Sequence, residues 1–281
     1  MNLQKLSQKS FLKLSGRILA CSLIFGTIVE NSRAELGFTN LTQTDFDKIS
    51  KELSSNFTHN SVLGASSLGK IFGLELAVVG GYTLSPEIDT IVKRSAPGSD
   101  LPKLYNAGFI AAVSVPFGIT AEAVLTPKVT AADASYQATS LAVKLSMNDE
   151  LIPIIPFNLA LRGIYSTNEF SFKQTISAVE ATVKDANNIT GLQILLSPKL
   201  PIVEPYAGIG FLNAKNTLSV SGTTGTIFDS SFNTTQSADS TLSSTQLLLG
   251  VDVRFLMLTA GVEYSKAFDA SKYTAKFGFS F

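Results

Sequence analysis

The chain of 281 residues contains one cysteine, one histidine and no tryptophan. One cysteine can form neither an internal disulfide nor a cysteine-based zinc site. Charge is also scarce, because 16% of the residues are charged against about 25% in an ordinary soluble domain. The 22 basic and 22 acidic residues balance without a basic run, which excludes the footprint of a nucleic-acid-binding protein. Hydrophobic residues make up 45% of the chain, so intrinsic disorder is excluded as well.

Long apolar runs are missing from the body of the chain, so no transmembrane helix is predicted there. The N-terminus differs, because four basic residues precede a short apolar run at 18–29 and Ser32-Arg33-Ala34 offers a small-residue cleavage site. This order predicts a secretory signal over residues 1–34. A buried N-terminal helix is the alternative, but basic residues ahead of an uncharged run suit export better. Removal of the signal would also remove Cys21, which suits an exported protein with no disulfide to form.

A short helix is predicted over residues 44–55, within an N-terminal segment at 35–71. Thr44 can cap it, and Phe46, Ile49 and Leu53 fall at the spacing of one apolar stripe. The helix is too short to be stable alone in water. It must therefore pack on another part of the protein.

From Phe72 onward the chain alternates apolar and polar residues, which predicts about ten β-strands. Longer connections are expected at 84–104, 127–135, 168–188 and 214–243, and Ser85-Pro86 can begin a helix in the first of them. A soluble β-sandwich would also alternate, but the apolar faces here carry almost no charge. The last strand alternates without a slip, and its apolar face carries Tyr273, Ala275, Phe277, Phe279 and Phe281.

A final strand that ends on phenylalanine in this way resembles the C-terminal strand of bacterial outer-membrane β-barrels. The resemblance implies an all-β fold, a closed antiparallel transmembrane barrel of about ten strands over residues 72–281. It also implies a Gram-negative outer membrane, contact with outer-membrane lipids and insertion by the barrel assembly machinery. Oligomeric state does not follow from it. The residues of the implied assembly signal are Tyr273, Phe277, Phe279 and Phe281.

If the apolar faces meet lipid, eight charged residues face the lumen, four of them acidic and four basic. This balanced set fits either an ion-pair network in a filled barrel or a polar channel with weak charge preference. We favour the filled or narrow interior, because a barrel of about ten strands is barely wider than its own side chains. The predicted lumen-facing residues are Glu75, Glu122, Lys144, Arg162, Asp252, Arg254, Glu263 and Lys276.

The helix at 44–55 is expected to cap the periplasmic mouth of the barrel, with partial insertion as the second choice. A partner-binding segment is the alternative role. Deletion of residues 35–60 should then leave the barrel folded and raise any conductance.

No catalytic constellation is visible in the sequence. His59 lies in a polar stretch before the first strand, where a histidine is usually solvated. No metal-ligand spacing or cofactor fingerprint is found, so we expect neither an enzyme nor a bound cofactor. Two classes of function remain: a narrow porin-like channel that transports small polar solutes, or a non-conducting structural or surface-interaction barrel. The second would act through extracellular loops 84–104 and 214–243.

Overall fold

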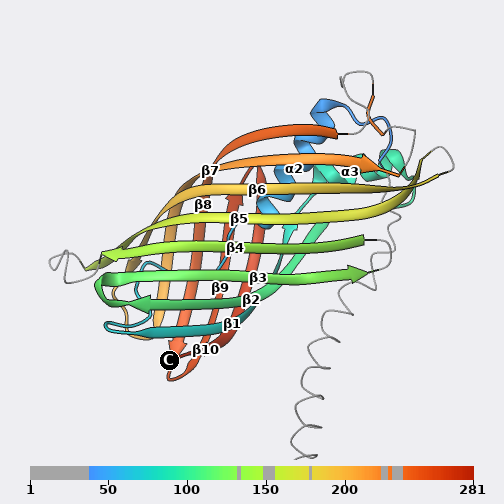
Figure 1. The fold of residues 1–281 in the computed structure, drawn as a ribbon. Coiled ribbons are helices and arrows are strands. Elements are labelled where there is room, and N and C mark those ends of the chain that lie inside the picture. The colour runs from blue at the N-terminus through green and yellow to red at the C-terminus, as the bar shows by residue number, and fades with distance from the viewer. Residues whose placement is uncertain (1–37, 132–133, 148–155, 177–178, 223–226, 230–236) are drawn as a thin grey trace, which may run out of the picture. The chain divides into compact units, whose positions relative to one another are not determined.

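A computed structural model describes residues 38–131, 134–147, 156–176, 179–222, 227–229 and 237–281. The predicted signal over 1–34 lies outside these residues. Ten antiparallel strands form a closed barrel, in which β1 pairs with β10 and every other strand pairs with its neighbours in the chain (Figure 1). The strands are β1 (Gly73–Leu84), β2 (Lys103–Val115), β3 (Ile119–Ala131), β4 (Ala134–Met147), β5 (Phe157–Ile176), β6 (Val179–Pro198), β7 (Val203–Ser221), β8 (Ser237–Phe255), β9 (Leu258–Ala267) and β10 (Ala270–Ser280).

The closed ten-stranded barrel confirms the predicted fold class. Within the described residues two helices accompany it, α2 (Gln43–Phe57) and α3 (Pro86–Ser95), and a short 3-10 turn, η1 (Pro116–Gly118), links β2 to β3. α3 begins where Ser85-Pro86 predicted a helix. No helix within the described ranges is long and apolar enough to cross a membrane.

Strands β5 to β8 are much longer than the others, at 19 or 20 residues against 10 in β9. Figure 1 shows them continuing past the ends of β9 and β10 on the side that carries the helices. Residues 168–176, 179–188, 214–221 and 237–243 are therefore strands, where the sequence led us to expect loops. β5 and β6 stay paired as far as Ile176 and Val179, while β7 continues to Ser221 and β8 starts at Ser237.

The long strands exchange their apolar face along their length, and β6 shows this most clearly. In its second half, Leu192 and Ile194 are exposed on the outer wall. In its first eleven residues, Val183 and Ile189 are buried on the inner wall, while Lys184 points outward and pairs with Glu169. An outer face of apolar residues, as in the second part of β6, suits an apolar surrounding. An outer face of charged residues, as in its first part, suits water. We call these two parts of the barrel its apolar half and its polar-walled half.

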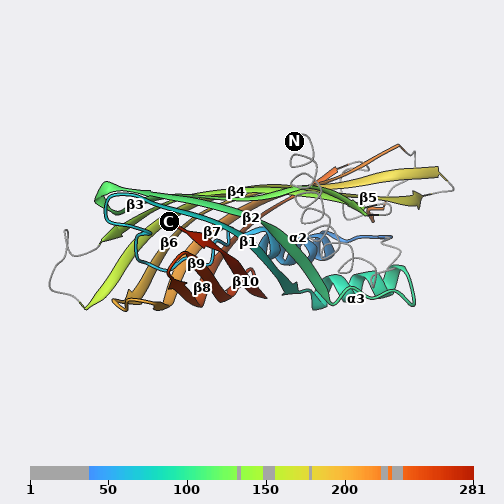
Figure 2. The ribbon, with the colours of Figure 1, turned by 90° about the horizontal axis from the view of Figure 1, so that it is seen from below.

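α2 lies inside the polar-walled half. Its cap is Thr42 rather than Thr44, because the Thr42 hydroxyl accepts a hydrogen bond from the Asp45 N–H at 3.1 Å and the Asp45 carboxylate accepts one from the Thr42 N–H at 3.1 Å. Phe46, Ile49 and Leu53, the predicted stripe, are all buried. Figure 2 shows α2 among the strands. The elements packed against it are α3, β1, β2, β5, β6, β8 and β10.

The helix does not cap the mouth where it was first expected, and it lies within the barrel instead, closer to the second choice of insertion. α2 lies at the mouth formed by the β1–β2 and β9–β10 connections, where Lys51 pairs with Asp269 and the Glu52 carboxylate accepts hydrogen bonds from the Glu87 and Ile88 N–H groups. Because connection 84–104 was expected on the extracellular side, the expected periplasmic mouth is the opposite end of the barrel, where β10 ends. The helix lies where it does because the inward apolar faces of β5 to β8 bury its stripe, and those faces belong to residues expected in loops.

Candidate functional site

The chain that follows α2 runs down the inside of the barrel to its other end. Residues 58–65 are all buried. The segment meets Lys272 of β10 at Thr58, Glu122 of β3 at His59, and Glu204 at the start of β7 at Ser66. We call residues 43–67, α2 included, the luminal segment. Main chain therefore occupies the lumen along its length, which is more than the partial insertion of a helix that the sequence offered as a second choice.

Glu122 is the centre of the contact between the luminal segment and the wall. Its carboxylate accepts a hydrogen bond from the Ser61 hydroxyl at 2.6 Å and lies 3.0 Å from His59 Nε2. On the wall side, Arg162 Nη1 is at 3.4 Å and Lys144 Nζ at 3.8 Å, and both side chains are fully buried. Lys144 in turn donates to the carbonyl of Gly64 at 2.8 Å. Buried charges are tolerated only when paired and hydrogen-bonded, and here the luminal segment supplies part of that pairing.

A second group of charges lies at the end of the barrel where the luminal segment leaves it. Glu204 pairs with Arg254 and accepts a hydrogen bond from the Ser66 N–H at 2.8 Å. Lys276 bridges Glu75 at 2.7 Å and Asp252 at 2.9 Å. These contacts tie β1, β7, β8 and β10 together around the exit of the segment.

The structure places all eight predicted lumen-facing residues on the inner wall, where Arg254 alone is partly exposed. Two inward-facing charged residues were not predicted, Glu204 of β7 and Lys272 of β10. Glu204 shares a face with Tyr206, and Lys272 shares a face with Lys276, so extending the alternation of each strand would have found them. It also missed the role of His59, which the sequence does not signal. His59 is 1% exposed, so the expectation of a solvated loop histidine is wrong.

His59 lies between a serine and a glutamate, the residue types of a hydrolase triad, but its two ring nitrogens are exchanged relative to that triad, where Nε2 faces the serine and Nδ1 faces the acid. Its Nδ1 lies 2.5 Å from Ser140 Oγ and its Nε2 lies 3.0 Å from Glu122. The Ser140 hydroxyl is also bonded by Ser166 at 2.9 Å, and all of these side chains are buried. A nucleophile must be reachable by its substrate. The arrangement therefore fits a structural contact between the segment and β4, rather than catalysis. Across the described residues, no group of three or more His, Cys, Asp or Glu side chains could hold a metal ion.

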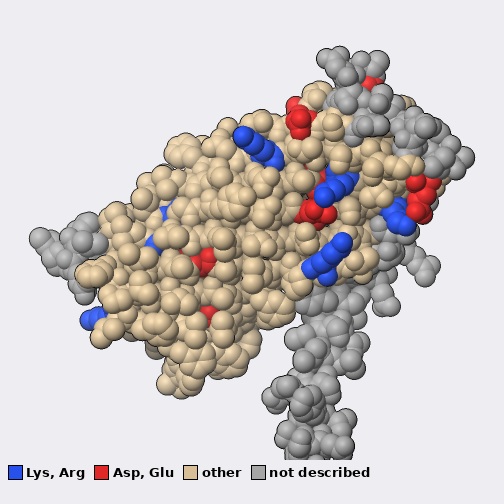
Figure 3. Space-filling view, in the orientation of Figure 1, with Lys and Arg blue, Asp and Glu red and all other residues tan. Residues whose placement is uncertain are grey.

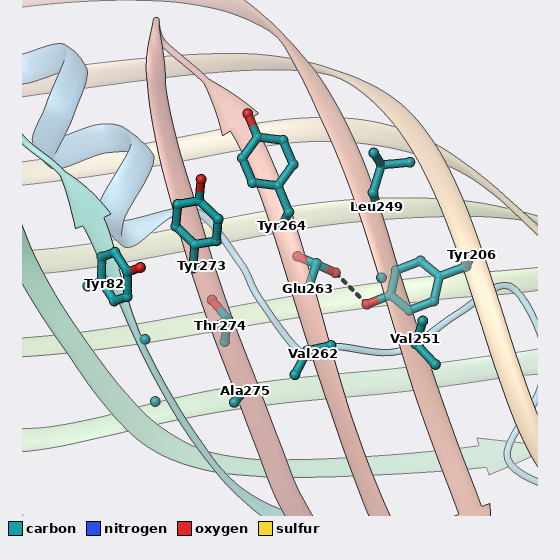
Figure 4. A pocket seen from close by; sticks show the side chains of 13 residues that line it. Tyr82, Tyr206, Leu249, Val251, Val262, Glu263, Tyr264, Tyr273, Thr274 and Ala275 are labelled. Atoms are coloured by element: carbon teal, nitrogen blue, oxygen red, sulfur yellow. Dashed lines mark hydrogen bonds between the residues drawn. The ribbon is translucent and has the colours of Figure 1, made fainter.

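Glu263 takes part in a further contact of the inner wall. The Tyr206 hydroxyl donates to its carboxylate at 2.7 Å, as Figure 4 shows. The Tyr206 ring lies against Gly250 of β8, where an added Cβ would come within 2.4 Å of the ring. Glycine is therefore required at this position to let the ring lie flat on the wall.

Gly250→Ala should destabilise the barrel by about 1–3 kcal/mol, because the new methyl group must displace the Tyr206 ring and its bond to Glu263. Thermal unfolding of the purified protein in detergent measures the loss. Gly163→Ala is the matched control, since a Cβ there meets nothing within 4 Å. Equal melting temperatures for the two variants would contradict this account of Gly250.

The outer wall of the apolar half is bounded by aromatic residues. Tyr105, Tyr82, Tyr273 and Tyr264 lie side by side on four neighbouring strands, with ring centroids 5.3–6.3 Å apart. Phe281 lies eight residues beyond Tyr273, which is about 27 Å along a strand and about 20 Å along the axis of a barrel with strands tilted by about 40°. In Figure 3 most of the visible charged side chains lie toward the helix-bearing end. The wall therefore carries an apolar band between aromatic rims.

Just below the tyrosines the outer wall has an apolar hollow of about 700 Å³. Leu249, Val251 and Val262 line it, and Gly80 and Gly81 leave room for it (Figure 4). All four residues of the implied assembly signal also lie on this outer wall, namely Tyr273, Phe277, Phe279 and Phe281. Their role in assembly stays a prediction.

Comparison with known proteins gives three kinds of result. No curated protein matches the sequence. Among solved structures, the chain is similar to the attachment invasion locus protein Ail of Yersinia pestis (12% identity, TM-score 0.33, covering 75% of this chain and 99% of that one). It is also similar to the translocator domain of the autotransporter NalP from Neisseria meningitidis (13%, 0.44, 85% and 95%) and to the N-terminal β-barrel domain of Pseudomonas aeruginosa OprF (10%, 0.32, 76% and 99%). A family model described as a family of unknown function, DUF6588, matches residues 26–281.

Proposed function

This chain belongs to the DUF6588 family, and we propose that it is a bacterial outer-membrane barrel closed by its own luminal segment. A closed barrel leaves no unpaired strand edge, as a lipid surrounding requires. The apolar band between aromatic rims matches the form of a membrane-spanning barrel wall. The predicted export signal and the aromatic C-terminal strand support the same location.

One observation carries the closure: the luminal segment follows the inside of the barrel and is buried there. Diffusion of small polar solutes needs a continuous water path, and main chain with fully buried residues such as Ser61 and Val62 lies where that path would run. The segment is also bonded to β3, β4, β7 and β10 through charged groups. This favours a non-conducting barrel over an open porin-like channel.

Such a barrel would act through its polar-walled half. In β6, the ten residues that precede Ile189 belong to this half, and they amount to about 33 Å of strand. Exposed ion pairs such as Lys173–Glu180 and Glu169–Lys184 cover its outer face. With α3 beside it, this half offers a large water-facing surface for recognition outside the membrane.

A porin-like channel is the second candidate, and the chemistry of the wall supports it. If the luminal segment moved out, the exposed inner wall of the apolar half would be polar and charged, with both signs represented by Glu122, Lys144 and Arg162. A water-filled lumen could hydrate these groups. The channel would then be gated by the segment.

Planar-bilayer recording of the full-length protein distinguishes the two candidates. The proposed closure predicts no steady conductance from inserted barrels whose folding is confirmed by heat-modifiable migration. A steady ohmic conductance from most inserted molecules would overturn the closure and favour the channel.

Phe281 belongs both to the implied assembly signal and to the junction between β1 and β10 that closes the barrel. Its N–H donates to the Leu74 carbonyl at 2.7 Å and its carbonyl accepts from the Leu74 N–H at 2.9 Å. Deletion of Phe281 should lower the amount of barrel in the outer membrane several-fold, as judged by heat-modifiable protein. Phe281→Leu keeps both main-chain bonds and removes only the aromatic ring. Normal assembly of this variant would show that assembly depends on the main-chain bonds between Phe281 and Leu74 and not on the aromatic ring.

A further inference from the structure

A row of asparagines crosses the inner wall beside α2. Asn168, Asn187 and Asn216 are register partners on β5, β6 and β7, and all three are buried. Asn187 Nδ2 donates to Ser54 Oγ of α2 at 2.8 Å, and that hydroxyl donates to Asn216 Oδ1 at 3.2 Å. The row therefore fixes one face of α2 to the wall.

Asp185 lies two residues from Asn187 on the same face of β6. It is 2% exposed, and neither of its carboxylate oxygens has a hydrogen-bond partner in the described part of the chain. The neighbouring Lys184 is on the outer face, bound to Glu169. A buried carboxylate is costly unless a cation or a proton neutralises it.

Other buried side-chain oxygens without partners among the described residues lie on β5, β6 and the face of α2 that packs near them. The Oδ1 atoms of Asn168 and Asn187 also lack partners among the described residues, because the asparagine Nδ2 groups make the bonds instead. Ser50 Oγ is likewise unpartnered, and Ser50 lies one helical turn from Ser54 on the same face of α2. Within the described residues, neither the Ser50 hydroxyl nor any of the asparagine Nδ2 groups donates to the Asp185 carboxylate, so both of its oxygens are left for another ligand.

We propose that Asp185, Asn168, Asn187 and Ser50 form a binding site for a hard cation of the calcium class. Carboxylate, amide and hydroxyl oxygens are the ligands that calcium takes, in flexible geometries with six to eight oxygens. Magnesium fits less well, since it requires a near-ideal octahedron and usually keeps several waters. With one carboxylate the affinity should fall in the range of weak extracellular sites, about 0.1–1 mM. The bound ion would hold α2 against β5 and β6.

The test uses the full-length folded barrel, stripped with a chelator and dialysed against calcium, magnesium or an equal ionic strength of NaCl. We expect about one bound calcium per chain and a melting temperature raised by roughly 2–5 °C at saturating calcium, with no such rise in the other salts. Asp185→Asn should weaken calcium binding at least ten-fold. Asp239→Asn is the matched control, because Asp239 lies on the outer face of nearby β8 and is exposed.

Three outcomes would overturn the proposal. Wild-type protein that binds no calcium in equilibrium dialysis is the first, and it needs no variant. The second is an Asp185→Asn variant that binds calcium as tightly as the wild-type protein does. The third is an Asp185→Asn barrel more stable than wild type in every salt, which would show that a proton neutralises the carboxylate. If Asp185→Asn fails to fold, Asn168→Ala replaces it, with the same expected loss of calcium binding.

Discussion

Arg162→Ala should lower the free energy of unfolding by about 3–5 kcal/mol, because it leaves buried charge without its partner. The Arg162 guanidinium donates to Gln193 at 2.6 Å and to Ser61 at 3.1 Å, and lies 3.4 Å from Glu122. After the substitution, the Glu122 carboxylate retains His59 and the more distant Lys144. The luminal segment also loses a contact at Ser61. Urea unfolding in lipid vesicles measures the stability.

Arg94→Ala is the matched control for Arg162. Arg94 also pairs with an acid, Asp45 at 2.7 Å, but its side chain is 52% exposed. Exposed ion pairs contribute about 1 kcal/mol or less, so this variant should unfold close to wild type. If the two arginine variants lost the same stability, the buried network around Glu122 would not be what holds the segment.

Phe46→Ala should release α2 from the wall, with a loss of about 3–5 kcal/mol. Phe46 is fully buried in the apolar core formed by α2, α3 and the inner faces of β5 to β8, so its truncation leaves a cavity. Hydrogen exchange of the amides in α2 should accelerate by at least 100-fold, provided that α2 opens separately from the barrel.

Phe211→Ala provides the comparison for Phe46→Ala. Phe211 is 66% exposed on the outer wall of β7, so its removal leaves no internal cavity. Exchange in α2 should then remain as in wild type. Slow exchange of α2 in the Phe46 variant would contradict the packing described here.

These contacts also change the expected result of deleting residues 35–60. Sequence reasoning treated the helix as a separate cap, so the barrel was expected to survive. The deletion would remove His59 from Glu122 and the Asn56 and Thr58 carbonyls from buried Lys272, which donates to both at 2.9 Å. Point substitutions therefore test closure more cleanly than deletion does.

The apolar half could be predicted from sequence because one physical rule covers all ten strands. An apolar residue at every second position fixes which face is outside, and charges such as Arg162 then fall inside by parity. The polar-walled half breaks that rule. In β6, Val183 and Ile189 are inside while Lys184 is outside, so a search for an apolar outer face interprets these residues as a loop.

The luminal segment could not be found by periodicity. Residues 58–67 have no helical or strand period, and their polar side chains are typical of a solvated connection. They are buried because the wall supplies their partners, as Glu122 does for Ser61. Those partners lie 61 or more residues away in the chain, and local sequence carries no record of such pairings.

Whether the luminal segment lies buried inside the folded barrel can be measured by its accessibility to a thiol reagent. With Cys21 replaced by serine, Val62→Cys places the one thiol in the lumen at a residue that is 0% exposed, and Ile71→Cys places it at a residue that is 79% exposed. Folded barrels are treated with a membrane-impermeant maleimide. We expect rapid labelling at residue 71 and labelling at least 100-fold slower at residue 62, until the barrel is unfolded. Labelling of both positions at similar rates in the folded barrel would contradict the burial of the luminal segment.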